Sequence, residues 1–154
     1  MVSKAGYAGP VRAVAAEEEL CNGCGLCELA CSLLAEGACN PSLSRITVSR
    51  DFFAGRFYPE TCRQCPDAEC MSSCPVEGAM VVDAATGARR IVEEVCTGCG
   101  ACSSACPFNG DLGVVKRRGD KFVKCDMCFS RSEGPICVSV CPTNALKVAV
   151  RGAG

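Results

Sequence analysis

The sequence predicts an α+β fold of short β-hairpins and short helices, and three observations support that prediction. Short apolar runs bounded by turn residues recur along the 154 residues, which is typical of strands. The stretch over residues 28–37, ELACSLLAEG, resembles the start of a helix. The chain also holds 17 cysteines but no Trp, 2 Tyr and 6 Phe, so large side chains are too few to fill an ordinary core. Something besides side chains is therefore expected in the interior.

The expected strands form two sets. One set follows the cysteine-rich stretches, and each of its members comes after a small or turn-forming stretch; these strands lie near residues 80–82, 112–115 and 146–150. Their candidate partners begin upstream, over residues 9–17, 44–50, 88–95 and 120–125. Short helices are expected where each cysteine-rich stretch ends. No run is long and apolar enough to span a bilayer.

Sixteen of the 17 cysteines fall into four blocks, each of which begins C-x2-C and ends C-x3-C. The last three blocks end in Cys-Pro, at Pro75, Pro107 and Pro142. Cys39 is the cysteine left over. In order, the blocks are Cys21, Cys24, Cys27 and Cys31; Cys62, Cys65, Cys70 and Cys74; Cys96, Cys99, Cys102 and Cys106; and Cys125, Cys128, Cys137 and Cys141.

The first and third blocks predict iron–sulfur chemistry most directly. Each holds three cysteines in a tight loop, with glycines that allow the backbone to approach bound sulfur closely: Gly23, Gly25, Gly98 and Gly100. The third block matches C-x2-C-x2-C-x3-C-P, the bacterial run that binds [4Fe–4S] clusters and lends its fourth cysteine to a second cluster. The first block differs by having Ser32 in place of the proline. Four blocks of four thiols therefore predict four [4Fe–4S] clusters.

Three other uses of the cysteines suit the pattern less well. Zinc sites usually draw on two well-separated C-x2-C knuckles rather than three cysteines within seven residues. A disulfide framework needs an oxidising compartment, and the first twenty residues have no apolar signal core. That N-terminus predicts an untargeted, cytoplasmic protein. Thioredoxin-like chemistry would use a single C-x2-C in a βαβ unit, which the pattern does not indicate.

The blocks resemble those of the four-cluster, ferredoxin-like electron-transfer subunits of multisubunit redox enzymes. That family serves molybdenum and tungsten pterin oxidoreductases such as aldehyde oxidoreductase and formate dehydrogenase, and also hydrogenases and carbon monoxide dehydrogenase. The resemblance extends from about Val11 to Val150 and rests on the stretches CNGCGLCELAC, PETCRQCPDAECMSSCPVEGAM and KFVKCDMC, the last before a lengthened gap.

The resemblance implies two nested bacterial-ferredoxin-like units. Residues 1–55 and 116–154 would form an outer unit with blocks one and four, and residues 56–115 an inserted inner unit with blocks two and three. Pairing block one with two and block three with four is the alternative that spacing leaves open. The implied ligand sets are Cys62, Cys65, Cys70 and Cys106; Cys96, Cys99, Cys102 and Cys74; Cys21, Cys24, Cys27 and Cys141; and Cys125, Cys128, Cys137 and Cys31.

The expected function is electron relay without catalysis. Four thiolates saturate each cluster, and the chain has no His, no G-x-G-x-x-G run and no phosphate loop. The resemblance implies a large catalytic partner, with a tungsten or molybdenum pterin enzyme favoured, and a flavin subunit or other electron-exchanging partner. A free polyferredoxin that serves several enzymes is the alternative. Nucleic-acid binding is not expected, because no basic stripe with aromatics is present and the net charge is -1.

A few single residues carry further expectations. Glu28 and Asp126, inside blocks, are candidates for lowering a cluster's reduction potential unless they are solvated surface carboxylates. Lys124, beside Cys125, is a candidate for raising one. Phe108 and Phe129 are expected to shield clusters from water, and Cys39 is expected to be buried or idle.

Overall fold

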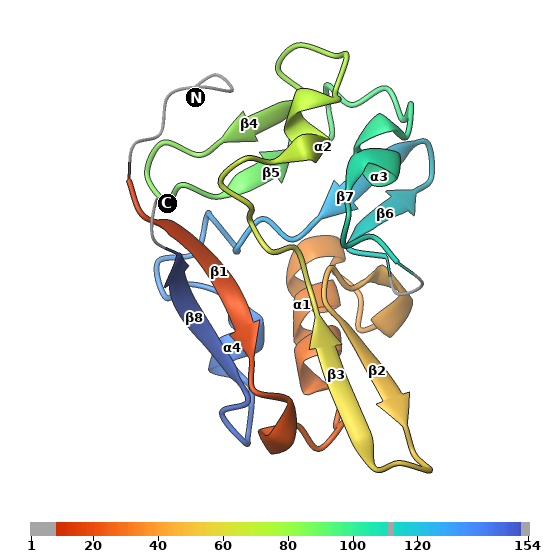
Figure 1. Cartoon of the computed structure of the whole chain (residues 1–154), viewed down its shortest axis with the longest axis vertical. Coiled ribbons are helices and arrows are strands. Elements are labelled where there is room, and N and C mark those ends of the chain that lie inside the picture. The colour runs from red at the N-terminus through yellow and green to blue at the C-terminus, as the bar shows by residue number, and fades with distance from the viewer. Residues whose placement is uncertain (1–8, 111–112, 152–154) are drawn as a thin grey trace.

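The computed structural model describes residues 9–110 and 113–151 and shows small paired strands linked by short helices, as the α+β prediction requires (Figure 1). The described strands form four separate two-stranded antiparallel sheets. Three are hairpins of consecutive strands: β2 (Thr47–Asp51) with β3 (Arg56–Glu60), β4 (Met80–Val82) with β5 (Arg89–Ile91), and β6 (Val115–Arg118) with β7 (Lys121–Lys124).

The fourth sheet joins opposite ends of the described chain. β1 (Val11–Ala16) pairs with β8 (Leu146–Arg151), in a register that sets Val11 against Arg151 and Ala16 against Leu146. Figure 1 shows the two strands side by side, red against blue. The two were expected as strands over 9–17 and 146–150, but no feature of the sequence indicated that they would pair with each other.

The helices are short except for one. α1 (Leu26–Glu36) runs for 11 residues between Gly25 and Gly37, whose φ angles of 76° and 72° lie in the left-handed region that favours glycine. Three shorter helices lie in the later blocks, each holding one block cysteine: α2 (Glu69–Ser72), α3 (Ala101–Ala105) and α4 (Ile136–Ser139). Two single turns of 3-10 helix, η1 (Glu18–Leu20) and η2 (Pro41–Leu43), complete the described elements.

The structure corrects the strand prediction at two places. β3 was not expected; its Pro59 lies opposite Val48, and every strand of a two-stranded sheet is an edge strand that tolerates proline. The strand expected near 112–115 begins later, at Val115 of β6, and Leu112 lies outside the described residues. β4 matches the expected 80–82.

The buried side chains gather in two cores rich in cysteine. The first lies between α2, α3, β4, β5 and β7, and includes Met80, Val82 and Phe122. The second lies around α1, α4, β2 and β8, and includes Ile46, Val48 and Leu146. Cysteines from blocks two and three border the first core. Cysteines from blocks one and four border the second, together with Cys62 from block two. Within the described residues, no helix combines the length and apolar character needed to cross a membrane.

Candidate metal centres

All four C-x2-C loops share one backbone feature. The residue before the second cysteine has a left-handed φ, which is 71° at Gly23, 51° at Gln64, 70° at Gly98 and 60° at Met127. The turn directs backbone N–H groups towards sulfur. The amide of Gly98 donates to Cys96 Sγ at 3.4 Å, and that of Met127 donates to Cys125 Sγ at 3.5 Å. The two glycines were expected from the sequence, whereas Gln64 and Met127 would emerge only from aligning the four blocks.

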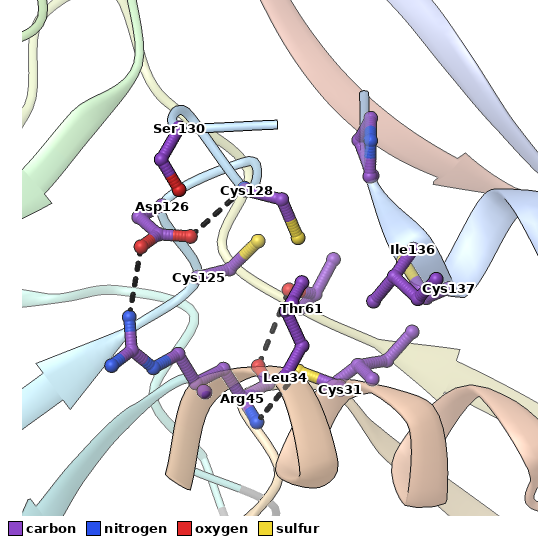
Figure 2. A pocket seen from close by; sticks show the side chains of 13 residues that line it. Cys31, Leu34, Arg45, Thr61, Cys125, Asp126, Cys128, Ser130, Ile136 and Cys137 are labelled. Carbon is purple, nitrogen blue, oxygen red and sulfur yellow. Dashed lines mark hydrogen bonds and ion pairs between the residues drawn. The ribbon is translucent and has the colours of Figure 1, made fainter. Parts of the chain in front are cut away.

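One cavity lies between block four and the end of block one. It is lined by Cys31, Cys125, Cys128 and Cys137, with apolar walls that include Ile46 and Ile136. We name these four cysteines the Cys125 group. Figure 2 shows Cys31 on α1 across the cavity from Cys125 and Cys128. The cavity measures about 200 Å³. Folded cores keep few voids larger than a water molecule, so a void of this size rimmed by four thiols suits a resident inorganic group.

Two further cavities are each lined by four cysteines. One joins block one to the last cysteine of block four, and the other joins block three to the last cysteine of block two. We name these sets the Cys21 group, which is Cys21, Cys24, Cys27 and Cys141, and the Cys96 group, which is Cys74, Cys96, Cys99 and Cys102. All three cavities thus combine blocks one and four or blocks two and three, rather than one with two or three with four.

The remaining block cysteines, Cys62, Cys65, Cys70 and Cys106, are also close neighbours, and we name them the Cys62 group. Burial raises the pKa of the Cys70 thiol, and the charges of Cys62, Cys106 and Cys65 add to that rise. Burial likewise raises the pKa of Cys106, with smaller contributions from Cys62 and Cys65. All sixteen cysteines expected at the site therefore fall into four groups of four. Which metal group each set ligates remains a prediction.

The spacing of the thiols does not suit a single metal ion. In the part of the chain that the structure describes, no group of three or more His, Cys, Asp or Glu side chains is placed to hold one ion. A zinc tetrathiolate would draw four sulfurs to about 2.3 Å from a common centre. The cavity of about 200 Å³ at the Cys125 group has room for a larger, multinuclear group, whose irons would each take one thiolate.

Burial suppresses the reactivity of these thiols. It raises the pKa of Cys27 and of Cys125 to about 12, and that of Cys102 to about 11. At neutral pH such thiols stay protonated and are poor nucleophiles until a metal displaces the proton. They are suited to holding a metal group rather than to covalent catalysis.

Glu28 and Asp126, the two block carboxylates expected to influence a cluster, are each paired, so neither is a free surface charge. Glu28 is only 3% exposed; it accepts from the backbone N–H of Val48 at 2.9 Å and pairs with Arg50 at 2.5 Å. Asp126 pairs with Arg45 at 3.0 Å. The sequence offered no signal for either arginine partner. The charge of each carboxylate is therefore offset by an arginine, and their influence on a cluster potential stays a prediction.

Arg45 also connects distant segments. Its guanidinium lies 2.7 Å from Glu93, 3.0 Å from Asp126 and 3.8 Å from Glu36, and its backbone N–H donates to Cys31 Sγ at 3.4 Å. Glu93 lies two residues after the β4–β5 hairpin, whereas Asp126 belongs to block four. One side chain thus ties the two cores together beside the Cys125 group.

Lys124 is placed differently from the carboxylates. Its sequence neighbour is Cys125, but its Nζ donates to Cys62 Sγ at 3.3 Å, and the residue is 2% exposed. Burial opposes the charge, yet the cysteines around it, Cys62 foremost, outweigh that effect and raise its pKa.

The remaining expectations concern two aromatic residues and the spare cysteine. Phe129 packs against the second core, with Arg90 4.2 Å from its ring centroid. Phe108 is 37% exposed, and the guanidinium carbon of Arg63 lies 4.2 Å from its ring centroid. Cys39 is exposed rather than buried, and it lines none of the three cavities described above.

Comparison with known families agrees with this geometry. A model of the 4Fe-4S dicluster domain matches residues 53–151, and a model of a 4Fe-4S binding domain matches residues 18–34. The chain belongs to the 4Fe-4S dicluster family. The family resemblance expected from the cysteine blocks is thereby confirmed.

Curated relatives of this 4Fe-4S dicluster protein include a polyferredoxin-like subunit and proteins named for electron transport. It is 44% identical over 121 residues to the aliphatic sulfonate oxidoreductase, polyferredoxin-like subunit, of Pyrococcus furiosus, a match that covers 79% of this chain and 66% of the relative. The chain thus spans just under two thirds of that relative's length. It is 35% identical over 143 residues to the putative electron transport protein YsaA of Escherichia coli K12, covering 88% of each.

A solved structure shares the fold of the 4Fe-4S dicluster protein. A chain of the active site complex BamBC of benzoyl coenzyme A reductase, solved with benzoyl-CoA, superposes with a TM-score of 0.56. The two are 25% identical, and the match covers 93% of this chain and 81% of that one. Together with the family match, these relatives establish an electron-transfer protein of the oxidoreductase-subunit type that binds multiple [4Fe–4S] clusters.

Proposed function

We propose that this protein is the dedicated electron-transfer subunit of a redox complex and carries four [4Fe–4S] clusters. It would relay electrons between a catalytic subunit and another redox subunit, such as a flavoprotein, or a mobile carrier. We favour a tungsten or molybdenum pterin oxidoreductase as the catalytic partner, with the aldehyde oxidoreductase type as the leading case. The chain itself would be non-catalytic, cytoplasmic and without affinity for nucleic acid.

Each of the four cysteine groups is proposed to ligate one cluster. The support is the set of three cavities, each lined by four cysteines that unite blocks one and four or blocks two and three. The Cys62 group has the mutual electrostatic effects of close neighbours. When bound, the clusters supply reversible one-electron transfer. The chain holds the thiols at fixed positions, buries seven of the sixteen and leaves two exposed.

The nested organisation is part of the same proposal. The outer unit would comprise residues 1–55 and 116–154, and the inner unit residues 56–115. Two observations favour it: β1 pairs with β8 across the length of the described chain, and the buried side chains gather in two cores rather than one.

The four groups also follow one another in a row. After burial, Cys70 of the Cys62 group contributes to the raised pKa of Cys102 in the Cys96 group. In the same way Cys62 contributes to the raised pKa of Cys125, and Cys27 to that of Cys137. These cross-group effects support the proposed order Cys96 group, Cys62 group, Cys125 group, Cys21 group.

Exposure of the cysteines distinguishes the ends of this row from its middle, and this observation carries the proposal. Cys99 in the first group and Cys24 in the last are exposed, whereas every cysteine of the two middle groups is buried or half-buried. A row that is open at both ends and closed along its length is what a conductor between two partners requires.

Metal analysis of the anaerobically purified full chain tests the number of clusters. We expect about sixteen iron atoms and as many acid-labile sulfides per chain, because each cubane holds four of each, and no stoichiometric zinc. About eight irons would reduce the protein to two clusters and overturn the four-cluster proposal. Zinc in place of iron would overturn it entirely.

A free polyferredoxin is the second candidate, because relatives such as YsaA and HydN of Escherichia coli are named only as electron transport proteins. Purification from the native host under argon separates the two. A stoichiometric complex with a large pterin-containing subunit supports the dedicated subunit. A monomer that reduces and is oxidised by unrelated enzymes supports the free carrier.

A further inference from the structure

The end of β7 places a buried cation between the two middle cysteine groups. Lys124 is 2% exposed, and its Nζ donates to Cys62 Sγ at 3.3 Å. The next residue, Cys125, belongs to the neighbouring group. Isolating a charged amine from water is costly unless opposite charge compensates it. The groups around Lys124 must therefore supply negative charge.

Carboxylates do not supply that charge. Within residues 9–110 and 113–151, Lys124 forms no ion pair with an aspartate or glutamate. The atom that accepts from its amine is Cys62 Sγ, at 3.3 Å. Glu28 and Asp126 present the opposite case, because each is neutralised by an arginine. Lys124 is thus a cation that no carboxylate compensates, and it is directed at metal-ligating sulfur.

The structure holds this amine firmly in position. Lys124 pairs with Val115 in the β6–β7 hairpin, which fixes its backbone. The block-two loop is fixed against the same place by Gln64, whose Nε2 donates to the carbonyl of Cys125 at 2.7 Å and whose Oε1 accepts from the N–H of Arg89 at 2.6 Å. The amine and the Cys62 loop are therefore held together from both sides.

We propose that Lys124 sets the reduction potential of the Cys62 group and makes it the highest of the four. This inference rests on the proposed function, since it takes the Cys62 group as a cluster ligand set. A cluster gains one negative charge on reduction, and a fixed positive charge nearby stabilises the reduced form. The effect weakens with distance and solvent access, so the Cys125 group is affected less and the exposed end groups least.

The row of clusters would then have its highest reduction potential at an inner cluster rather than at an end. An electron that enters at either exposed end would rest preferentially on the Cys62 group, away from water and oxidants. Lys124 would act through the cluster's ligand and would take no direct part in any reaction, so it is a positioning charge rather than a catalytic residue.

Potentiometric titration followed by electron paramagnetic resonance tests the inference on the anaerobically purified full chain. In Lys124→Met, which keeps the length of the side chain without its charge, we expect the highest midpoint potential to become more negative. The lower midpoints should move less. The matched control is Lys147→Met, which removes an exposed lysine paired with Glu17 and should leave every midpoint unchanged. Unchanged midpoints in Lys124→Met, or an equal shift of all four, would overturn the inference.

Iron content separates this test from that of the proposed function. Too little iron in the unmodified protein defeats the four-cluster proposal, whereas full iron with no shift in Lys124→Met defeats only the role of Lys124. If Lys124→Met fails to retain its clusters, the Cys65→Ala variant tests instead whether the Cys62 group has the highest midpoint potential. Removing this ligand of the Cys62 group should abolish the signal with the highest midpoint potential, and loss of a lower one would refute the inference.

Discussion

The cysteine loops of blocks one and three differ from those of blocks two and four at the residue that makes the turn. Glycine occupies the left-handed position in the first pair, at Gly23 and Gly98, and a larger side chain occupies it in the second, at Gln64 and Met127. The glycine loops carry the exposed cysteines, and Gln64 and Met127 are buried. Loops at the ends of the row use an intrinsically relaxed turn, whereas loops in its middle depend on surrounding contacts to hold a strained one.

Removing a ligand cysteine should cause the largest loss of iron and stability of any change considered. Comparing a middle group with an end group shows whether the loss of stability differs between the two regions. Cys137→Ala and Cys99→Ala should each lose about a quarter of the iron, because each breaks one proposed ligand set. Cys137 is buried and Cys99 exposed, so heating under argon should bleach the Cys137→Ala protein at the lower temperature. Cys39→Ala is the control and should keep its full iron. A larger loss of stability from Cys99→Ala would contradict the contrast.

Arg45→Met should be the next most disruptive change and acts on the middle of the row. It leaves Asp126 and Glu93 without their cation beside the Cys125 group. Arg45 pairs with three partly exposed carboxylates, and losing all three pairs together should cost about 3 kcal/mol. Denaturant titration under argon measures the effect, and Arg56→Met is the control, because Arg56 lies exposed at the start of β3. Equal midpoints for the two variants would show that Arg45 does not hold the cores together.

Gly98→Ala probes an end loop. An added Cβ would lie 2.0 Å from the carbonyl oxygen of Asp120, in a backbone conformation of φ 70°. Left-handed strain and overpacking together should cost about 2 to 3 kcal/mol. Gly78→Ala is the matched control, since Gly78 has φ 78° but nothing within 4 Å of an added Cβ. Thermal unfolding of both variants under argon measures the difference. Identical destabilisation would mean that the approach of Asp120 does not constrain the loop.

Gln64→Ala probes a middle loop and should have the smallest of these effects. The change removes the bonds to Cys125 and Arg89 while the backbone keeps its positive φ. Leaving buried backbone partners unsatisfied should cost about 2 kcal/mol. Gln64→Gly should recover part of that loss by relaxing the turn. Denaturant titration ranks the three proteins, and a Gly variant less stable than the Ala variant would contradict strain at this position.

Much of the fold and site follows from local pattern. The cysteine spacing predicted which segments form binding loops, and apolar runs predicted β4 and β8, because both depend on near neighbours in the sequence. β3 was missed, since Pro59 argues against a strand unless that strand lies at an edge. The partners of Glu28 and Asp126 were also missed. Arg50 and Arg45 lie 22 and 81 residues away from them, and no local pattern reports contacts that depend on the assembled chain.

The pairing of β1 with β8 has a consequence for how the protein is made. A ribosome releases the chain from its N-terminus, so residues 62–106 are available together long before β8 emerges. Cys21, Cys24 and Cys27 must wait for Cys141, which is translated after every other cysteine of the four blocks. A message cut short before that codon would yield a protein whose Cys21 group lacks one sulfur. Translation through Cys141 is thus a precondition for completing one exposed end of the row.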